Sequence, residues 1–402
     1  MSATPRELNY PSLETAECPY PIFEKLREAG GVYQVPGENE FMVADHELVS
    51  EALRTPEVYS SHTQLAAEAQ PGWETSVFSS DPPDHTVKRE IAYRSFNPRK
   101  LKEYTPMVQG VIDELIDDFI DEGRCEFVTQ FANPMSSRVM FNILGLEAEE
   151  WAWSADIEFE GAGARYLPPD LQKLQDRDGA RLNAQMTAVV EDRIANPRDD
   201  AISNLIVGHR ERTGEVNVPY LAVESTVLLL GGVLTSAHLS GSAMLLLLQN
   251  PEQMELVRAD FSKIPRMLEE ALRLESALQF MPRYTTTDTE LGGVEIPAGS
   301  NVLLLFASAN RDGEVFEEPE AFDPSRSNVK RHLGFGLGPH FCLGAPLARL
   351  EGKLAFETLF TRLGEIRLAE GNEFLHIDSA FNRGPKELFL EFDAAGPRAR
   401  PQ

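Results

Sequence analysis

The longest stretch without a charged side chain places the strongest constraint on the fold. From Ser225 to Pro251 there is no Asp, Glu, Lys or Arg, which is long enough to cross a bilayer. Small and polar residues such as Gly231, Gly232 and Ser236 interrupt the stretch, and the Lys, Arg and aromatic residues that flank a membrane helix are missing. The stretch therefore predicts a long helix through the middle of a large core.

Apolar spacing in the rest of the chain predicts a mostly α fold with a minor β-sheet portion (α+β). Apolar residues recur three and four apart, as in helices, in the following segments: Met107 to Ile120, Met135 to Leu144, Ala180 to Ile194, Tyr220 to Leu248, Pro251 to Val257, Ile264 to Leu274 and Leu347 to Leu363. Strand-like runs are shorter: Gly31 to Val43, Arg283 to Ile296, Asn301 to Leu305 and Glu387 to Phe392.

No linker with a shift in composition divides the chain. We therefore expect a single domain over residues 1–402, with residues 1–18 as a loose N-terminal arm. Residues 64–83 and 155–175 lack a clean period, and we expect them to form long loops or frayed helices that cover a site.

Charge and cysteine content narrow the class of protein. The 402 residues include 37 basic and 64 acidic side chains, a formal net charge of −27, which disfavours nucleic acid and anionic membranes as partners. Cys18, Cys125 and Cys342 are too few, and odd in number, for a disulfide framework. The first thirty residues contain no apolar run typical of a signal peptide. We expect a soluble cytoplasmic protein.

One cysteine lies in a loop that is rich in glycine. Residues 332–349 read HLGFGLGPHFCLGAPLAR and place four glycines near Cys342: Gly334, Gly336, Gly338 and Gly344. Pro346 and the apolar stripe that begins at Leu347 predict a helix start just after the cysteine. Amide groups and the dipole at a helix N-terminus favour a thiolate, the form needed in a metal ligand or a nucleophile. The alternative is a buried structural cysteine in a tight turn, although packing alone hardly explains four glycines.

This loop resembles the haem-binding loop of the cytochrome P450 family, which reads Phe-x-x-Gly-x-(His/Arg)-x-Cys-x-Gly. The matching residues are Phe335, Gly336, Gly338, His340, Cys342 and Gly344. The resemblance extends over roughly residues 19–392 and implies the large, mostly helical fold of that family with one haem b. It also implies that Cys342 is the axial thiolate ligand of the haem iron.

Two further sets of residues match the family. Glu270 and Arg273 lie three apart in a predicted helix and can meet on one face, although an isolated pair of this kind is usually a surface ion pair. The resemblance places them with Arg326 in a buried network that fixes the cysteine loop, a structural role. Haem propionates need cationic or hydrogen-bonding partners, and the resemblance implies four of them: His85, Arg89, Arg283 and His340.

The central helix departs from the family at one position. The family usually carries (Ala/Gly)-Gly-x-(Asp/Glu)-Thr there; Gly231, Gly232 and Thr235 match, but Leu234 stands in place of the acid. By resemblance the acid relays protons and the Thr hydroxyl orients dioxygen and water. Ordered water, a substrate hydroxyl or His238 are possible replacements for the acid. If none of these replaces the acid, the protein runs on peroxide or does not activate dioxygen. We therefore expect slow or poorly coupled turnover with a ferredoxin system.

The activity implied by the resemblance is a haem-thiolate monooxygenase that hydroxylates a small hydrophobic substrate with dioxygen and electrons from a separate ferredoxin and its reductase. Residues 88–102 carry six basic side chains against one acidic (6 − 1 = +5) and, with Lys330 and Arg331, would form a basic dock for an acidic ferredoxin. The alternatives are a non-oxygenase haem protein (isomerase, dehydratase or ligand sensor) and a peroxide-driven peroxygenase. By resemblance the substrate pocket is lined by these segments: 61–78, 155–167, 230–235, 277–281 and 380–381.

Overall fold

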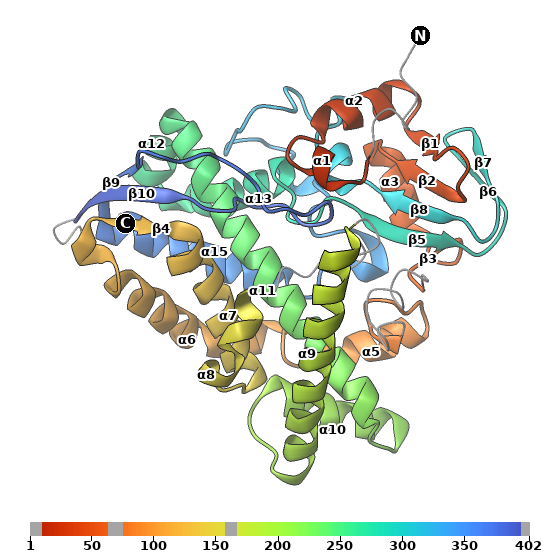
Figure 1. Ribbon diagram of the computed structural model, residues 1–402, viewed down its shortest axis with the longest axis horizontal. Coiled ribbons are helices and arrows are strands. Elements are labelled where there is room, and N and C mark those ends of the chain that lie inside the picture. The colour runs from red at the N-terminus through yellow and green to blue at the C-terminus, as the bar shows by residue number, and fades with distance from the viewer. Residues whose placement is uncertain (1–9, 63–74, 157–166, 395–402) are drawn as a thin grey trace.

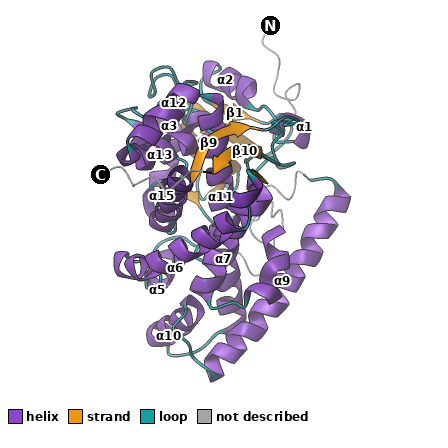
Figure 2. Ribbon diagram, turned by 90° about the vertical axis from the view of Figure 1, so that its left-hand side faces the viewer, coloured by secondary structure: helices purple, strands orange, loops and turns teal. Residues whose placement is uncertain are grey.

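The computed structural model describes residues 10–62, 75–156 and 167–394. Helices make up most of these residues (Figure 2), and Figure 1 shows the larger sheet on one side of the molecule. The helices are α1 (Leu13–Ala16), α2 (Tyr20–Glu28), α3 (His46–Arg54), α5 (Asp84–Tyr93), α6 (Pro98–Asp117), α7 (Asn133–Leu144), α8 (Ala148–Trp151), α9 (Pro169–Ala195), α10 (Ala201–Thr213), α11 (Val218–Gln249), α12 (Pro251–Ala259), α13 (Ile264–Leu274), α14 (Phe306–Ala309) and α15 (Ala345–Arg362).

The larger sheet joins strands that are far apart in the sequence. Its order is β1-β2-β8-β5-β3, and β2 runs parallel to β8 while the other neighbours are antiparallel. The strands are β1 (Val32–Gln34), β2 (Glu40–Val43), β3 (Tyr59–Ser60), β4 (Arg124–Glu126), β5 (Met281–Thr285), β6 (Thr289–Leu291), β7 (Val294–Ile296), β8 (Asn301–Leu304), β9 (Leu363–Leu368) and β10 (Phe389–Ala394). The mostly α fold with a minor sheet portion is confirmed, and the predicted helix up to Leu363 gives way to β9 there.

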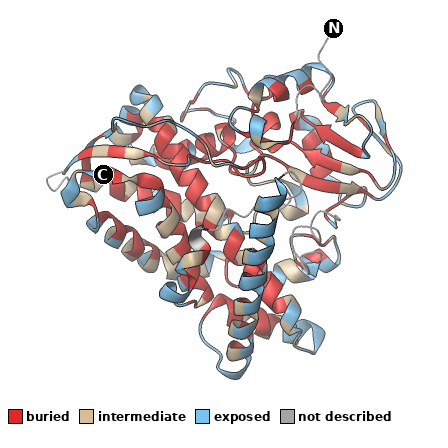
Figure 3. Cartoon of the chain, viewed as in Figure 1, coloured by how far each residue is buried: buried red, intermediate tan, exposed pale blue. Residues whose placement is uncertain are grey.

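Helix α11 is the predicted core helix. The side chain of Asn217 caps its N-terminus by accepting a hydrogen bond from the Tyr220 amide, and Pro219 occupies the first turn, where proline is tolerated. The helix crosses the centre of the molecule in Figure 1 and packs against α7, α9, α13 and α15. Its length and composition alone would also suit a membrane span. In this fold most of its side chains are buried against other helices (Figure 3).

Two segments were predicted to be long loops or frayed helices. Of residues 155–175, residues 157–166 lie outside the described part of the chain, and the regular helix α9 begins at Pro169. The buried residues of α9 begin only at Gly179, and its first half is exposed to solvent and carries no apolar stripe (Figure 3). Of the other predicted loop, residues 64–74 lie outside the described part, and residues 75–83 are largely irregular.

The chain is packed, not loose, from Tyr10 onward. The Tyr10 ring is 8% exposed and meets Phe23 edge to face, with ring centroids 5.1 Å apart. Arg383 donates to the carbonyl of Ala16 over 2.9 Å, and the Tyr20 hydroxyl lies 3.0 Å from a carboxylate oxygen of Glu275. The expected N-terminal arm is therefore corrected for residues 10–18: an aromatic ring and backbone carbonyls with distant partners hold them on the core.

Candidate functional site

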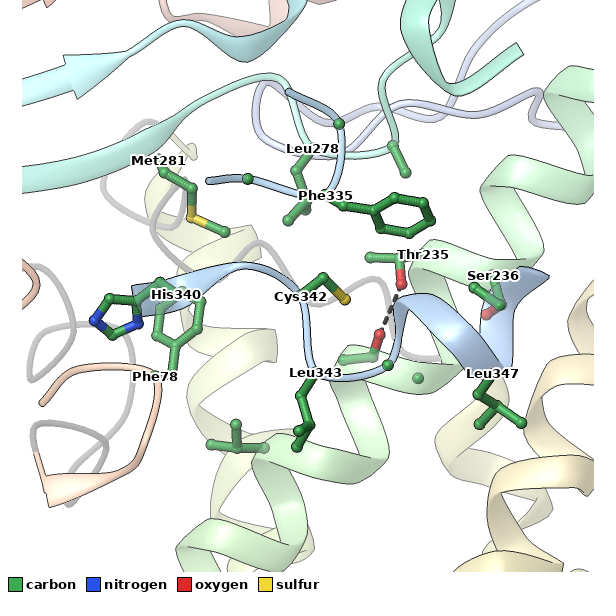
Figure 4. A pocket seen from close by; sticks show the side chains of 18 of the residues that line it. Phe78, Thr235, Ser236, Leu278, Met281, Phe335, His340, Cys342, Leu343 and Leu347 are labelled. Atoms are coloured by element: carbon green, nitrogen blue, oxygen red, sulfur yellow. Dashed lines mark hydrogen bonds between the residues drawn. The ribbon is translucent and has the colours of Figure 1, made fainter. Parts of the chain in front are cut away.

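A cavity of about 260 Å³ lies between α11 and the cysteine loop, residues 332–349. It is far larger than the roughly 10–15 Å³ that holds one water, so it is no packing defect. Figure 4 shows Cys342 and Phe335 on one side of it and Thr235 and Ser236 of α11 on another. Among the remaining residues that line it, the apolar ones include Val77, Phe78, Val227, Leu228, Leu278 and Met281.

The backbone of the cysteine loop turns Cys342 towards this cavity. The Cys342 amide donates to the carbonyl of Phe335 over 2.8 Å, closing the loop on itself. Gly338 has a φ of +70°, and a Cβ there would lie 2.4 Å from the Leu53 carbonyl oxygen, so only glycine fits. A Cβ at Gly334 would lie 2.6 Å from Leu272. Contacts with neighbouring elements of the protein thus explain two of the four glycines, whereas a Cβ at Gly336 or Gly344 would meet only ordinary contacts, at 3.6 and 3.9 Å.

The thiol lies just before a helix, as the sequence predicts. Gly344 is the N-cap of α15, and the amides of Gly344 and Ala345 donate to Cys342. Burial raises the pKa of the Cys342 thiol, and these amides together with Arg89 and Arg349 oppose that rise only in part. The helix N-terminus thus favours the thiolate, as expected, but the effect of burial on the pKa is larger. A cation bound at the sulfur would be needed to make the thiolate the favoured form.

Four cationic or hydrogen-bonding side chains from three segments gather at one end of the cavity. The imidazoles of His85 on α5 and His340 in the loop lie 4.1 Å apart between ring centroids. Arg283 on β5 is 7% exposed, and Arg89 donates to the carbonyl of Phe341 over 2.6 Å. All four line the cavity: His85, Arg89, Arg283 and His340.

Each of these side chains makes a positive charge on its neighbours less favourable. Burial, followed by repulsion from neighbouring cations, lowers the pKa of His85 to about 4 and that of His340 still further. Burial also lowers the pKa of Arg283 to about 10. Among the residues that the structure describes, none forms a hydrogen bond with the buried Nε2 of His340. Such a cluster fits a ligand that carries carboxylates, because an anion would both accept the open hydrogen bond and relieve the repulsion. Haem, with its two propionates, is a ligand of that kind.

The structure brings the predicted Glu270, Arg273 and Arg326 into one buried network. Arg273 donates to both carboxylate oxygens of Glu270 over 2.8 Å, and Nε of Arg326 donates to Glu270 over 2.9 Å. Arg273 also donates to the carbonyl of Asn310, whose side chain accepts a hydrogen bond from the Leu333 amide over 2.6 Å. The network thus connects α13 to the start of the cysteine loop.

A second network, which sequence reasoning missed, starts from the neighbouring residue Glu269. Its carboxylate accepts from Nε2 of His332 over 2.9 Å and from Arg349 over 2.6 and 2.8 Å, so it holds both ends of the cysteine loop. Nδ1 of His332 accepts from the Gly334 amide, and the Arg349 guanidinium lies 4.6 Å from the ring centre of Phe335. The only signal in the sequence is a second glutamate beside Glu270, which does not identify partners 63 and 80 residues away.

On α11, the residues of the family motif have different surroundings. Thr235 lines the cavity, and its hydroxyl donates to the Gly231 carbonyl over 2.7 Å. Gly231 and Gly232 both line the cavity as well; a Cβ at Gly232 would lie 2.4 Å from the sulfur of Met140, whereas nothing lies within 4 Å of one at Gly231. Leu234 packs against the apolar core.

The possible proton relay His238 points elsewhere. It is not among the residues that line the cavity, and a Cβ at Gly384 would lie 2.7 Å from its ring. Burial lowers the pKa of His238 to about 4. Of the predicted pocket segments, residues 77 and 78, the central helix and residues 277–281 contribute to the lining. Residues 63–74 and 157–166 lie outside the described part of the chain. Phe381 packs edge to face on Phe280 in the core. That part of the predicted pocket is corrected.

The basic stretch at residues 88–102 is largely compensated by acids. Arg99 pairs with Glu103 over 3.0 Å, Lys100 with Asp199 over 3.1 Å. Further pairs are Lys88 with Asp84, Arg94 with Glu211, and Arg331 with Glu47. The sequence count of +5 therefore overstates the local charge, because several of the acids come from segments far away in the chain.

Comparison with known proteins identifies the family. The sequence pattern of cytochrome P450 matches residues 163–392. The 6-deoxyerythronolide B hydroxylase of Saccharopolyspora erythraea is 34% identical over 326 residues, 79% of this chain and 78% of that protein. The steroid C26-monooxygenase of Mycobacterium tuberculosis is 32% identical over 390 residues, 93% of this chain and 96% of that protein. The P450 heme domain of Tepidiphilus thermophilus superposes with a TM-score of 0.87 at 27% identity, over 98% of each chain.

This chain belongs to the cytochrome P450 family. It is an oxidoreductase, a haem-thiolate monooxygenase with haem b as its cofactor.

Proposed function

We propose that Cys342 is the axial ligand of the haem iron and that the enzyme hydroxylates a small hydrophobic substrate with dioxygen and electrons from a ferredoxin. The observation that carries the proposal is that one cavity is bordered by Cys342, by the cationic cluster of His85, Arg89, Arg283 and His340, and by Thr235. In the overall reaction one C–H bond, one dioxygen, two electrons and two protons give an alcohol and one water.

Each group of side chains has a separate task in this proposal. The haem, when bound, supplies the activation of dioxygen and accepts the electrons. Phe335, Gly336 and Gly344, which also border the cavity, form the loop around the cysteine ligand, and the cationic cluster holds the propionates. Thr235 orients water or dioxygen with its hydroxyl, and the apolar lining excludes water and binds the substrate.

Ligand exchange at Cys342 tests the proposal directly. In the wild type the reduced carbon monoxide complex should show the red-shifted Soret band of a thiolate-ligated haem, and Cys342→Ser should abolish it. Cys18→Ser is the matched control, because Cys18 is exposed and should change nothing. A Cys342→Ser protein with the wild-type spectrum would overturn the proposal.

The ferredoxin is proposed to bind where the cysteine loop reaches the surface. Phe341, next to Cys342, is 37% exposed, and Arg89 donates to its carbonyl. The triple variant Arg99→Glu, Lys100→Glu, Arg331→Glu should slow reduction by ferredoxin at low salt and leave substrate titrations intact. Because acids already pair with these three side chains, we expect a loss of severalfold at most. Lys173→Glu, on the exposed first half of α9, is the matched control. If ferredoxin reduces the triple variant as fast as this control, the proposed ferredoxin site is wrong.

We also propose that the chain forms one domain and works in the cytoplasm. Helix α11 packs against helices from both halves of the sequence, and the larger sheet pairs β2 with β8, which supports one cooperative unit. A single unfolding transition seen by both haem absorbance and far-ultraviolet circular dichroism would agree with this.

A further inference from the structure

A short segment of the chain, residues 75–80, borders two cavities. Val77 and Phe78 line the cavity beside Cys342, and Phe78 is one of the side chains drawn around it in Figure 4. Thr75 lines a second cavity, of about 500 Å³, between α5, α9, α10 and α11. Because a cavity removes the partner atoms on the side where it lies, apolar packing holds this segment less firmly than it holds the core.

Polar contacts from two helices hold the segment. A carboxylate oxygen of Glu224 on α11 accepts a hydrogen bond from the Val77 amide over 3.0 Å. Nζ of Lys88 on α5 donates to the carbonyl of Thr75 over 2.6 Å and to the hydroxyl of Ser80 over 2.7 Å. Glu224 therefore binds the part of the segment that lines the cavity, whereas Lys88 binds its two ends.

The position of Glu224 calls for an explanation. It is fully buried and directly precedes the uncharged stretch of α11. Burial of a carboxylate costs free energy, and buried charged groups suit places where geometry must be fixed. Glu224 lies eleven residues before Thr235, about 16 Å along a helix, so it cannot reach the reacting atoms itself. Any effect on the reaction must pass through the residue that it holds.

We propose that Glu224 is a positioning residue for the substrate: its carboxylate fixes Val77, and through the backbone the ring of Phe78, where an apolar substrate contacts them. The inference rests on the proposed monooxygenase function, which assigns the apolar lining to the substrate. A wall that is already in place binds an apolar group without a cost for ordering the wall. Loss of the charge on Glu224 should loosen the wall, because hydrogen bonds to ionised acceptors are about twice as strong as neutral ones.

The charge of Glu224 changes near neutral pH. Burial raises its pKa to about 7, although its hydrogen bond and the charge of Lys88 oppose the rise. On the neighbouring elements the titratable groups are Asp84 and Lys88 of α5, which pair with each other, His209 of α10 and Tyr220 of α11. Burial lowers the pKa of His209 and raises that of Tyr220, so both favour their neutral forms. Among these described groups, Glu224 is thus the one that is mainly protonated at pH 6 and mainly ionised at pH 8.

Two haem ligands of different length test the position of the wall. Methyl isocyanide and n-butyl isocyanide both bind haem iron and carry no group that titrates near neutral pH, but only the second has an alkyl chain to contact the apolar lining. In the oxidised wild type, the affinity for n-butyl isocyanide relative to methyl isocyanide should fall about fivefold from pH 8 to pH 6, as the bond to Val77 loses its charged acceptor. Effects of pH at the iron act on both ligands and cancel in this ratio.

Two variants on α11 assign the effect to Glu224. Glu224→Gln keeps the shape of the side chain but carries no charge, so its affinity ratio should stay at the low wild-type value of pH 6 over the whole range. Ser225→Ala is the matched control: Ser225 is buried beside Glu224, and its hydroxyl donates to the Leu221 carbonyl of its own helix over 2.7 Å. This control should reproduce the wild-type pH profile. A merely structural loss would lower the affinity at every pH without removing its dependence on pH.

A second measurement needs no haem ligand. Amide hydrogen exchange in residues 75–80, corrected for the intrinsic effect of pH on exchange, should be faster at pH 6 than at pH 8 in the wild type and equal at both in Glu224→Gln. An affinity ratio of the wild type that does not change with pH, or a pH dependence that Glu224→Gln keeps, would overturn the inference. If Glu224→Gln does not fold, the two wild-type profiles decide. If instead the wild type shows no thiolate-ligated carbon monoxide complex, it is the proposed function that fails.

Discussion

The two walls of the cavity are held in place in different ways. The wall that carries Cys342 is fixed by charged side chains from distant segments, because Glu269 binds both ends of the loop and Glu270 binds Arg326 shortly before it. On α11, the hydroxyls of Thr235 and Ser240 bond to the backbone of their own helix one turn earlier. One wall is cross-linked through side chains, and the other depends on apolar packing and its own backbone.

This difference indicates which wall must hold an atom in a fixed position and which wall must stay open to water and substrate. Buried ion networks constrain position more surely than they add stability, so they suit a ligand atom that must stay in place. A helix whose hydroxyls bond locally leaves its exposed face free for water and substrate. The variants below test this contrast, beginning with the largest expected effect.

Loss of Glu270 should break the cross-linked wall. Glu270→Ala leaves Arg273 and Arg326 buried without a counter-charge, and removal of one partner from a buried pair costs about 3–5 kcal/mol. We expect a low yield of folded, haem-loaded protein and a matching drop in the free energy of unfolding in urea. Glu270→Gln, which still accepts hydrogen bonds, should be less severe. Wild-type stability in Glu270→Ala would show that the network does not hold this wall.

Glu351 on α15, a carboxylic acid that is only 1% exposed, should make stability depend on pH. The pKa of Glu351 is raised in the folded protein, so the folded state binds this proton more tightly than the unfolded chain, and stability falls as pH rises from about 4.5 towards 8. Between pH 5 and pH 8 this group should lower the free energy of unfolding by about 3 kcal/mol. Glu351→Gln should remove that fall. Equal pH profiles for the two proteins would contradict the buried, protonated state.

Weakening the Glu269 contacts should loosen the cross-linked wall less. Burial alone would raise the pKa of Glu269, but hydrogen bonds from Arg349 and His332 lower it to about 2. The stabilisation from this lowered pKa is present above about pH 4.5 and is lost as pH falls towards 2. Because Arg349 is 42% exposed, we expect Glu269→Gln to cost only about 1–2 kcal/mol. On acidification, Glu269→Gln should therefore lose the red-shifted carbon monoxide band at a higher pH than the wild type does. Glu269→Asp should lose the band at an intermediate pH.

The smallest expected effect concerns Leu234. We expect Leu234→Asp to raise the product formed per electron a few-fold, because it restores an acid next to Thr235. Leu234 packs against the core, so the stability of the variant must be measured alongside. No gain would mean that this wall does not need an acid at position 234.

The sequence predicted the parts of the site whose signal is local. Cys342, its glycines and the start of α15 lie within a few residues of one another, and the core helix has no charged side chain from Ser225 to its end. Glu270 and Arg273 were placed by a resemblance, and their shared face follows from helical spacing. These features can be predicted without knowing which residues pack against them in the fold.

Features that depend on distant partners escaped prediction. The two contacts of Glu269 span 63 and 80 residues, and acids from other segments neutralise Lys100 and Arg331. The start of α9 was missed because its first half packs against too little to require an apolar stripe. Likewise, Glu351 reads as an ordinary helix residue until the packing of α15 on α11 shows that it is buried.

The contacts of the N-terminal segment have a consequence for how the chain is made. The Tyr20 hydroxyl meets Glu275, 255 residues later, and Arg383 reaches back 367 residues to the Ala16 carbonyl. During synthesis this segment therefore leaves the ribosome long before these partners do. Tyr10, which also meets the ring of Phe280, likewise lacks that partner until late, so we expect the docking of this segment to be one of the last steps of folding.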